Sequence, residues 1–563
     1  MKVLLIYPYC LEERSRDDDV RVPPIGIYYI GALLLSRGHR VEILNLHGRQ
    51  EEKEQIRQVL RKWEPDIIGF SILHANRWGG LEVARIAKDL NPGVRIIFGG
   101  VGATYLWHHL LNHFQEVEYI VLSEGEYTFL ELVEYLSAGE KKDPAALKGI
   151  AFRQEGKPFK TAEREFIEDI DQLPDPSRYF TFQHVTSSRG CPWNCRFCGS
   201  PDFWKRKVRF HSPEYFVGQL ENLYRKGVDF FYISDDTFTF RKDRIIAICQ
   251  EILNRGLNIS WFAISRVNCI DADILYWMRK AGCIQISFGV ESGSERIRET
   301  ILNKQLKVDD IKYAFNLTAS YGILPRAYFI YGSPGENEET IQKSLDLMDE
   351  IKPLSAVFYI LDIFPGTALY RDYRERCGIS DDIWLEKKED IMYFETDNSL
   401  NQEMVLDFGR KLRGGYYRRL TDYVQDLELE DREDLYPSHA DFLVRLALTF
   451  THGDYAGIEA IKDKEKTAEK LFRKSLTYHF REKAYLGLGI IYQKNGSYQE
   501  SAAWLSEGLK HFSDSKSLHC CLAVSYMNLG RFREALPLLE KFKESPEAAG
   551  HLDICYKALG QAR

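Results

Sequence analysis

The sequence lacks the features that would assign it to several common classes of protein. None of its apolar runs reaches the roughly 18 residues that a membrane-spanning helix needs. The first eight residues, Met1 to Pro8, are shorter than a signal peptide and resemble a strand. The net charge of −8 is spread over interspersed acidic and basic residues, without the basic face typical of nucleic-acid binding. We therefore expect a soluble, cytoplasmic protein without a membrane span or a nucleic-acid partner.

Disulfide bonds are not expected either. The 11 cysteines are an odd number in a chain without an export signal, which predicts reduced thiols with a clustered subset of ligands. Most other cysteines are predicted to be core thiols: Cys249, Cys269, Cys283, Cys377, Cys520, Cys521 and Cys555. Cys377, beyond the barrel strands, could instead reach the active site. At 563 residues the chain should fold as three or four domains.

The first 145 residues alternate between short apolar runs rich in β-branched residues and helical patterns. This predicts a doubly wound parallel sheet, whose ligands bind beyond the carboxyl ends of the strands. The G-x-G-x-x-G sequence of dinucleotide sites does not follow the first strand, so an NAD site is not expected. The predicted strands are 2–7, 41–46, 66–71, 94–98 and 119–122, and the ligand-side loops are 8–26, the turn at His74 and Asn76, "GGVGAT" at 99–104 and "SEGE" at 123–126.

A second α/β region follows a connector at residues 146–183, in which a hairpin around Gly156 precedes a proline-containing linker. Strands are predicted at 182–187, 229–233, 258–264, 284–290, 326–331 and 356–363. Each strand ends in small, polar or acidic residues, as in "SDDTF", "SRVN", "ESGSE", "GSPGE" and "FPGT". Residues 184–400 therefore predict a βα barrel, full or partial, with its active site at the carboxyl ends of the strands.

Three cysteines are closely spaced in "SSRGCPWNCRFCGS", residues 187–200. Cys191, Cys195 and Cys198 have the spacing CxxxCxxC, and no fourth cysteine lies nearby. A structural zinc site needs four ligands, and the outside candidates His211 and Cys249 stand at no usual spacing. Three thiolates at a barrel mouth suit a four-iron four-sulfur cluster with one open iron. The spacing favours iron and sulfur over zinc without excluding zinc.

These cysteines, with Phe197 before the last of them and "DDTF", "GVESGSE", "YGSPGE" and "FPGT" in order behind them, resemble the radical S-adenosylmethionine (SAM) superfamily. The N-terminal "PPIGIYYIGALLLSRGH", "GGVGAT" and "SEGEYTF" resemble the Rossmann-like cobalamin-binding domain that is fused to a large branch of that superfamily. The resemblance covers residues 1 to about 400. It implies a partial, TIM-like barrel of the radical SAM type.

The resemblance implies roles for individual residues. Cys191, Cys195 and Cys198 would ligate a [4Fe–4S] cluster whose fourth iron binds SAM. Arg266 would pair with the SAM carboxylate as a two-point fork. The other SAM contacts implied are Phe197 on the adenine, Asp235 or Asp236 on the amino group, Ser265 and Glu291 on the amino or ribose hydroxyl groups, and backbone from Gly332 to Gly335 on the adenine edge. For Asp236, Arg266 and Glu291, an ion network at the barrel mouth is the alternative.

Cobalamin would lie between the edge of the first sheet and the barrel mouth. The Asp-x-His-x-x-Gly sequence that places a histidine on cobalt is missing, which predicts cobalt without a histidine below it. Cys10, His74 or Tyr9 could approach the cobalt, although each is more often a plain loop residue. The implied cobalamin contacts are Cys10, His74, Gly99, Gly100, Gly102, Ala103, Thr104, Ser123 and Glu124. For the glycines, a structural tight turn is an equal alternative.

The C-terminal part is helical, with a linker at 401–440 and a repeat domain at 441–563. Leu488, Tyr492 and Gly496 recur 34 residues later as Leu522, Tyr526 and Gly530. This period resembles the tetratricopeptide repeat, which often binds a protein partner. A simple helical cap on the barrel is the alternative.

These patterns predict a cobalamin-dependent radical SAM enzyme, foremost a methyltransferase acting on an unactivated carbon or on phosphorus. Radical cyclisation or rearrangement, with cobalamin transferring electrons, is the second possibility, and a repeat-based scaffold with idle cofactor sites is the third. We expect a small, lipid-like or natural-product substrate and a reducing partner such as flavodoxin or ferredoxin.

Overall fold

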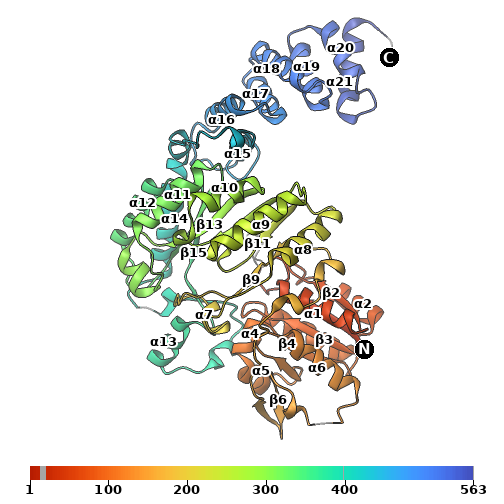
Figure 1. Cartoon of the computed structure of the whole chain (residues 1–563), viewed down its shortest axis with the longest axis vertical. Helices are drawn as coiled ribbons and strands as arrows, with labels where there is room; N and C mark the ends of the chain where they lie inside the picture. The colour runs from red at the N-terminus through yellow and green to blue at the C-terminus, as the bar shows by residue number, and fades with distance from the viewer. Residues whose placement is uncertain (13–20, 142, 397, 562–563) are drawn as a thin grey trace.

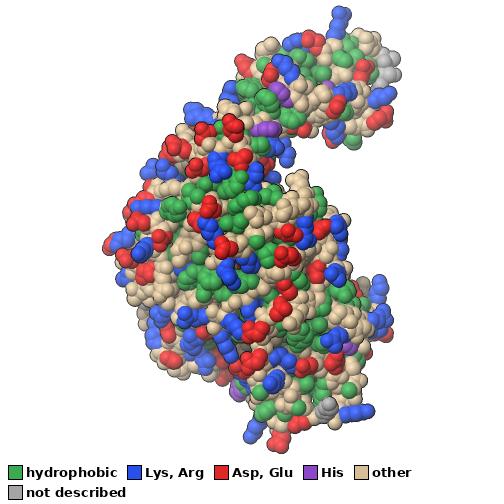
Figure 2. Space-filling view, in the orientation of Figure 1, with side chains coloured by type: hydrophobic (Ala, Val, Ile, Leu, Met, Phe, Trp, Pro, Cys, Tyr) green, Lys and Arg blue, Asp and Glu red, His purple; other side chains and the backbone are tan. Residues whose placement is uncertain are grey.

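The computed structural model describes residues 1–12, 21–141, 143–396 and 398–561. It has three parts: an N-terminal α/β domain, a second α/β region, and a helical arm that extends away from both (Figure 1). Acidic and basic side chains are interspersed on the face that Figure 2 shows, in line with the charge pattern of the sequence. In the described part of the chain, no helix is both long and apolar enough to cross a membrane.

The N-terminal sheet follows the predicted strands closely. Its strand order is β2-β1-β3-β4-β5-β6-β7, and its first five members are parallel. The hairpin β6–β7, which the sequence placed in the connector, pairs antiparallel with β5 and so extends this sheet. The strands are β1 (Lys2–Tyr7), β2 (Arg40–Asn45), β3 (Ile67–Ser71), β4 (Arg95–Gly99), β5 (Tyr119–Val121), β6 (Ile150–Gln154) and β7 (Lys157–Lys160).

Both faces of this sheet are covered by helices. Leu4 and Ile6 of β1 pack into one core, and Val3 and Leu5 pack into a second core on the opposite face. A near-continuous apolar strand is expected where helices cover both faces of a parallel sheet. The helices are α1 (Ile25–Ser36), α2 (Lys53–Trp63), α3 (Arg77–Leu90), α4 (Val101–Tyr105), α5 (Trp107–His113) and α6 (Glu126–Ser137).

The second sheet is parallel and six-stranded, in the order β15-β14-β13-β12-β11-β8. Its outer strands β8 and β15 are not paired with each other in the described residues, so the sheet is open. Helices alternate with the strands. The elements are β8 (His184–Val185), α8 (Pro213–Arg225), β11 (Phe230–Ile233), α9 (Lys242–Asn254), β12 (Ser260–Ser265), α10 (Ala272–Lys280), β13 (Cys283–Glu291), α11 (Val308–Ser320), β14 (Leu324–Tyr331), α12 (Glu338–Ile351) and β15 (Ser355–Ile360).

Short elements surround the carboxyl edge of this sheet. The hairpin of β9 (Ser188–Arg189) and β10 (Arg209–Phe210) encloses the cysteine loop and α7 (Ser200–Phe203). After β15 the chain forms β16 (Asp362–Ile363), α13 (Ala368–Cys377), a 3₁₀ turn at Asp381–Leu385, and β17 (Ile391–Met392), which pairs with β16. These segments lie beside the N-terminal domain (Figure 1).

The helical arm carries the sequence repeat in matching places. The helices α17 (Glu482–Lys494) and α19 (Lys516–Asn528) are offset by 34 residues, and Gly496 and Gly530 follow them with φ of +74° and +73°. Only glycine adopts this left-handed conformation readily, which explains the repeated glycine. The arm also contains α16 (Lys464–Tyr478), α18 (Tyr498–His511), α20 (Phe532–Glu540) and α21 (Pro546–Leu559), whereas α14 (Gln402–Gln425) and α15 (Tyr436–Thr451) pack against the second α/β region.

Candidate active site

The three clustered cysteines share one loop between β9 and α7, and each is partly buried. Burial raises the pKa of Cys191 and raises that of Cys198 to about 12, and both thiols interact electrostatically with Asp236 and Cys195. A metal would therefore have to supply the positive charge that stabilises the thiolates. Three thiols on one loop match the three protein ligands of a four-iron cluster with one open iron.

Two buried cations lie beside Cys195. The Arg266 guanidinium donates to the Lys304 carbonyl oxygen at 2.7 Å, and its Nη1 lies 3.7 Å from the Cys195 sulfur. Lys304 Nζ donates to Glu291 Oε1 at 2.7 Å and lies 5.6 Å from the Phe197 ring centroid. Burial alone would lower the pKa of Lys304, but Glu291 and Cys195 raise it above its usual value. The structure thus brings Phe197, Arg266 and Glu291 together around Lys304, and their contacts with SAM stay a prediction.

Sequence reasoning missed Lys304. It lies in "LNKQL", a loop with no pattern that marks a binding residue. Glu291 itself has φ of +66°, a strained conformation for glutamate that is typical of functional sites.

The two neighbouring aspartates after β11 have different roles. Asp235 is 1% exposed and accepts hydrogen bonds from the Ser187 backbone and from the hydroxyls of Ser187 and Ser188. Its carboxylate is therefore used to hold the strand before the cysteine loop, and the SAM contact that the sequence allowed for Asp235 is not supported. Asp236 accepts from Ser200 at 2.6 Å and faces the cysteines, and burial raises its pKa. Of the two alternatives, Asp236 faces the site.

The "GSPGE" turn after β14 closes on itself. Glu336 accepts hydrogen bonds from the amides of Gly332 and Ser333, at 2.6 and 3.0 Å, and the Gly335 carbonyl accepts from Arg296. The Gly332 amide is therefore not available to an adenine edge, contrary to the prediction. Gly332 and Gly335 have φ of +83° and +71°, so the tight turn accounts for both glycines. Ser265 is buried and is hydrogen-bonded to Thr239.

A cavity of about 320 Å³ lies between the carboxyl edge of the first sheet and the cysteine-bearing hairpin. Its walls come from the ends of β3, β4 and β5, from the start of α1, and from the residues around β9 and β11. Most of the wall is apolar, which fits a large ligand with extended apolar faces. The lining residues include Ile27, Ile30, Gly69, Ser71, Gly99, Gly100, Val101, Ser123, Glu124, Arg189, Trp204, Ser234 and Asp236. The predicted place for cobalamin is thus a real cavity.

The predicted glycines divide into two kinds. Gly99 and Gly100 line the cavity. A Cβ at Gly102 would lie 2.5 Å from the Leu73 carbonyl carbon, and one at Gly100 would lie 2.8 Å from the Ile72 oxygen. Close packing against the loop after β3 therefore accounts for Gly102 and contributes at Gly100.

Two further predicted residues connect the ligand-side loops. The Thr104 hydroxyl donates to the Gly100 carbonyl and accepts from the Ser123 amide. Ser123 has φ of +58°, which is a strained value for serine at the edge of the cavity. Ala103 is fully buried and does not line the cavity. A direct cobalamin contact remains a prediction for Gly99, Gly100, Ser123 and Glu124.

The carboxylate of Glu124 is committed to an ion network between the two sheets. It lies 2.6 Å from Arg189 Nη1 and 2.8 Å from Arg209 Nη1, and it accepts from the Ile167 amide at 2.7 Å. Arg189 also pairs with Glu126 at 2.7 Å. These side chains are all at most 8% exposed. The "SEGE" and "SSRG" motifs are thus partners, a relation that the sequence analysis missed.

None of the three candidates for the cobalt lines the cavity. His74 is hydrogen-bonded to Asp362 and Asp390 at 3.1 and 3.2 Å, and it stacks on Phe364. Burial alone would lower the pKa of His74, but the two carboxylates raise it. Tyr9 is fully buried and donates to Glu82, and Cys10 is buried beside it. The plain structural roles therefore account for His74 and Tyr9, and residues 13–20 of the same loop lie outside the described residues.

A second cavity of about 390 Å³ lies against the inner face of the second sheet, and α15 covers its far side. Ser234 lines both this cavity and the first one. Aromatic rings pack along its wall: His184 stacks on Tyr232 at 4.4 Å, and Tyr232 meets Phe262 edge-on at 5.4 Å. Its polar lining residues include Arg279, Gln285, Ser287, Arg326 and Arg445.

Comparisons with known proteins agree with this geometry. Residues 185–348 match the model of the radical SAM superfamily, and residues 19–133 match that of the B12 binding domain. The structure of the cobalamin-dependent SAM radical enzyme OxsB shares the fold with a TM-score of 0.55 at 18% identity, covering 99% of this chain and 84% of its own. The radical SAM methyltransferase TsrM from Kitasatospora setae gives 0.57 at 18% identity, covering 67% of this chain and 76% of its own.

Curated relatives are more similar in sequence. An uncharacterized methyltransferase of Pyrococcus horikoshii is 31% identical over 66% of this chain and 82% of its own length. An anaerobic magnesium-protoporphyrin IX monomethyl ester cyclase of Rubrivivax gelatinosus is 27% identical over 68% of this chain and 71% of its own. The chain therefore belongs to the radical SAM superfamily, in the branch whose members join a B12-binding domain to a radical SAM domain with its iron–sulfur cluster.

Proposed function

We propose that this protein is a cobalamin-dependent radical SAM methyltransferase. The observation that carries the proposal is that three sites share walls. Asp236 lines the cavity at the first sheet and faces Cys191 and Cys198, while Ser234 lines that cavity and the one inside the second sheet. A methyl donor, a radical source and an acceptor must lie within a few ångströms of one another for such a transfer. The open six-stranded sheet would then be the expected partial barrel.

The cofactors supply the reaction chemistry when bound: the cluster and SAM provide a 5′-deoxyadenosyl radical that removes hydrogen, and cobalamin provides the methyl group. The residues of the chain hold and shield these groups. Cys191, Cys195 and Cys198 would bind the cluster. Arg266 and Lys304, both beside Cys195, would hold the SAM carboxylate, and Asp236 would accept from its amino group.

The acceptor would bind in the cavity inside the second sheet. Its aromatic wall suits a ligand with flat or apolar surface, and aromatic packing there excludes water from the radical. Arg326 and Arg445 on the same wall suit an anionic group on that ligand, such as a carboxylate or phosphate. These features support a small-molecule or natural-product acceptor.

Cyclisation or rearrangement is the second candidate, because relatives from three organisms bear the cyclase name at 26–28% identity. It uses the same three sites.

The helical arm would bind a protein partner through tetratricopeptide-like repeats, and flavodoxin or ferredoxin would supply electrons. A scaffold with idle cofactor sites is the remaining alternative.

The test is anaerobic reconstitution with iron, sulfide and hydroxocobalamin, followed by gel filtration and metal analysis. We expect about four irons and one cobalt per chain. With SAM and a reductant, 5′-deoxyadenosine should form, and SAM labelled in its methyl group should transfer label to bound cobalamin. Iron without cobalt would contradict methyl transfer. Cobalt and deoxyadenosine without labelled cobalamin would favour cyclisation, and protein without iron would favour the scaffold.

A matched pair of variants locates the cobalt. Gly99→Leu should fill part of the cavity at the end of β4 and abolish cobalt retention while iron loading is kept. Gly99→Ala should keep both, because its Cβ would meet its nearest neighbour, the Val121 oxygen, at 3.6 Å, which is an ordinary contact. Equal cobalt in both variants would place cobalamin elsewhere.

A further inference from the structure

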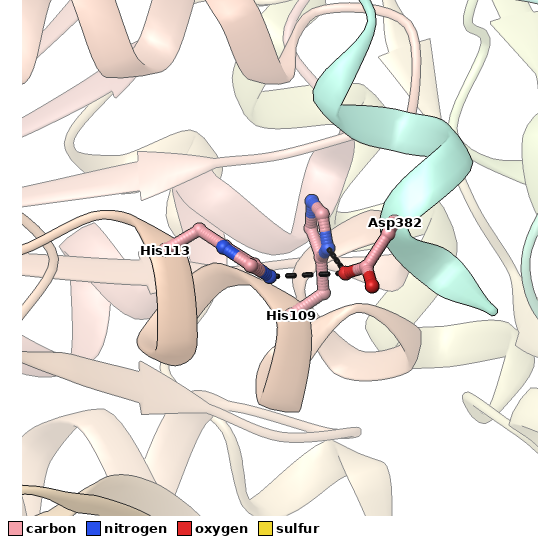
Figure 3. Close-up of side chains that lie close together, drawn as sticks. All are labelled: His109, His113 and Asp382. Atoms are coloured by element: carbon pink, nitrogen blue, oxygen red, sulfur yellow. Dashed lines mark hydrogen bonds and ion pairs between the residues drawn. The ribbon is translucent and has the colours of Figure 1, made fainter.

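A group of metal-ligand side chains lies outside the cofactor sites, between α5 and the 3₁₀ turn at Asp381–Leu385. His109 and His113 stand four residues apart, so they share one face of α5. Asp382 approaches that face from a segment almost 270 positions later in the chain (Figure 3). The ligand atoms of these three residues all lie within 4.8 Å of one another.

Within the described residues, the two ring nitrogens of His109 lack hydrogen-bond partners. The residue is 3% exposed, yet neither ring nitrogen makes a hydrogen bond. Its Nδ1 lies 3.9 Å from Asp382 Oδ1, toward which it is aimed in Figure 3. Leaving a buried polar nitrogen without a partner costs about 1–3 kcal/mol. An ion at this point would supply the missing partner.

The geometry suits a small divalent cation. His113 Nε2 lies 3.0 Å from the same Asp382 oxygen. Zinc bonds of about 2.0–2.2 Å in a tetrahedral site place neighbouring ligand atoms roughly 3.3–3.5 Å apart, so shifts of about half an ångström would bring each of these two nitrogens to that distance from the Asp382 oxygen. The Asp382 side chain is 62% exposed and that of His113 is 28% exposed, which leaves the fourth position open to water.

We propose that His109, His113 and Asp382 form a zinc site that fastens the segment after α13 to the N-terminal domain. Two imidazoles and one carboxylate are a donor set that zinc prefers. Burial lowers the pKa of His109 to about 4, so its ring is neutral and able to ligate at pH 7. The turn is already shaped for this role, since the Ser380 hydroxyl accepts from the Asp382 amide.

The segment after α13 also contacts the N-terminal domain at two other points. Arg77 donates to the carbonyl oxygens of His74 and Trp384, and Glu389 accepts from the amides of Leu11 and Glu12 in the loop after β1. A zinc ion at α5 would add a third attachment to these two. In the other three-residue group, the His74 Nε2 is already hydrogen-bonded to both Asp362 and Asp390.

The test uses the reconstituted protein, so that iron occupies the cluster cysteines and zinc cannot. After dialysis against low micromolar Zn²⁺, elemental analysis should find about one zinc per chain, and zinc should raise the thermal midpoint. His113→Ala and Asp382→Asn alter partly exposed side chains and should still fold, and each should weaken zinc binding at least about 10-fold. His109→Gln should do the same.

The matched control is His108→Ala on the same helix, whose exposed side chain lies next to His109 in sequence. This variant should retain zinc as wild type does. Absence of zinc from the wild-type protein would overturn the proposal. So would zinc that His113→Ala and Asp382→Asn leave in place, or zinc that is lost on His74→Ala instead. Iron content serves as the check that reconstitution succeeded in every variant.

Discussion

The two parallel sheets turn their carboxyl edges toward each other, but the residues at the two edges differ. The edge of the first sheet presents small and apolar residues with strained backbone, such as Gly99, Gly100 and Ser123. The edge of the second sheet presents charged side chains, the buried Arg266 and Lys304 and the more exposed Asp236. The first edge is shaped for a large ligand with apolar faces, and the second is shaped for a small ligand with charged groups.

The comparison also separates two kinds of charged residue. Frame residues have their charged groups bonded to other parts of the protein, and ligand-facing residues border the proposed cofactor sites. Asp235 and Glu124 have every carboxylate oxygen engaged by the protein, whereas Asp236 and Arg266 face the cysteine loop. Position at a strand end is therefore not sufficient evidence for a role in binding. Whether the side chain also borders the cysteine loop distinguishes the two groups.

The largest effect should come from the cysteine loop. Replacing Cys191, Cys195 and Cys198 together by alanine should abolish iron loading but leave cobalt binding at the first edge intact. Iron and cobalt analysis of the reconstituted variant measures both. Cys269→Ser is the control, because this thiol is electrostatically coupled to Cys191 but lies outside the loop. Loss of cobalt along with iron would show that the two edges are not independent.

Loss of a frame residue should lower the stability of the protein. Arg189→Met leaves Glu126 without its buried partner, and breaking a buried pair costs about 3–5 kcal/mol. Urea unfolding should show this loss, and adding Glu126→Gln should restore part of it. Arg225→Met, whose side chain is 70% exposed in its pair with Glu221, should change stability by at most about 1 kcal/mol. A loss of similar size in both would contradict the assignment of Arg189 to the frame.

The sequence predicted the strands and the two ligand edges well because both depend on local patterns. Apolar runs with β-branched residues mark strands, and glycines and acidic residues mark their ends. The strands predicted at 2–7 and 119–122 agree with β1 and β5 to within a residue. The cysteine loop was recognised because its spacing is itself the signal.

The pairings between distant segments could not be predicted in the same way. The contact of Glu124 with Arg189 joins residues 65 positions apart, and the hairpin β6–β7 joins a sheet whose edge is not marked in the sequence. Lys304 and Asp382 lie in loops whose positions depend on tertiary packing. A single charged residue in such a loop carries no periodicity, so no sequence pattern could identify it.

Ligand-facing residues should change affinity with little effect on stability. Arg266→Met should weaken SAM binding about 10- to 100-fold, since a hydrogen bond to a charged group contributes about 1.5–3 kcal/mol. Equilibrium dialysis of the reconstituted protein with SAM measures the affinity, and the iron content confirms the cluster. The control is Arg241→Met, an exposed position directly before α9, and this variant should bind SAM as wild type does. Unchanged SAM affinity in Arg266→Met would assign Arg266 to the frame.

The smallest effect concerns Glu336, a frame residue at the second edge. Burial raises its pKa from the usual 4.5 to about 7, although the amides of Ser333 and Gly332 act in the opposite direction. The folded state thus binds this proton more tightly than the unfolded state does. The resulting stabilisation is complete below pH 4.5 and is lost as the pH rises to about 7.

Glu336→Gln should remove this pH dependence, because glutamine is neutral throughout and its oxygen can still accept from the two amides. From pH 4.5 to pH 7, wild type should lose about 2–3 kcal/mol of stability at most relative to the variant, since each unit of pKa corresponds to about 1.4 kcal/mol. Urea unfolding of both proteins at several pH values measures the difference. Parallel pH profiles would mean that the carboxyl has the same pKa in the folded and unfolded states. In that case the amides of Ser333 and Gly332, together with the charge of Arg296, would offset the whole effect of burial on the pKa of Glu336.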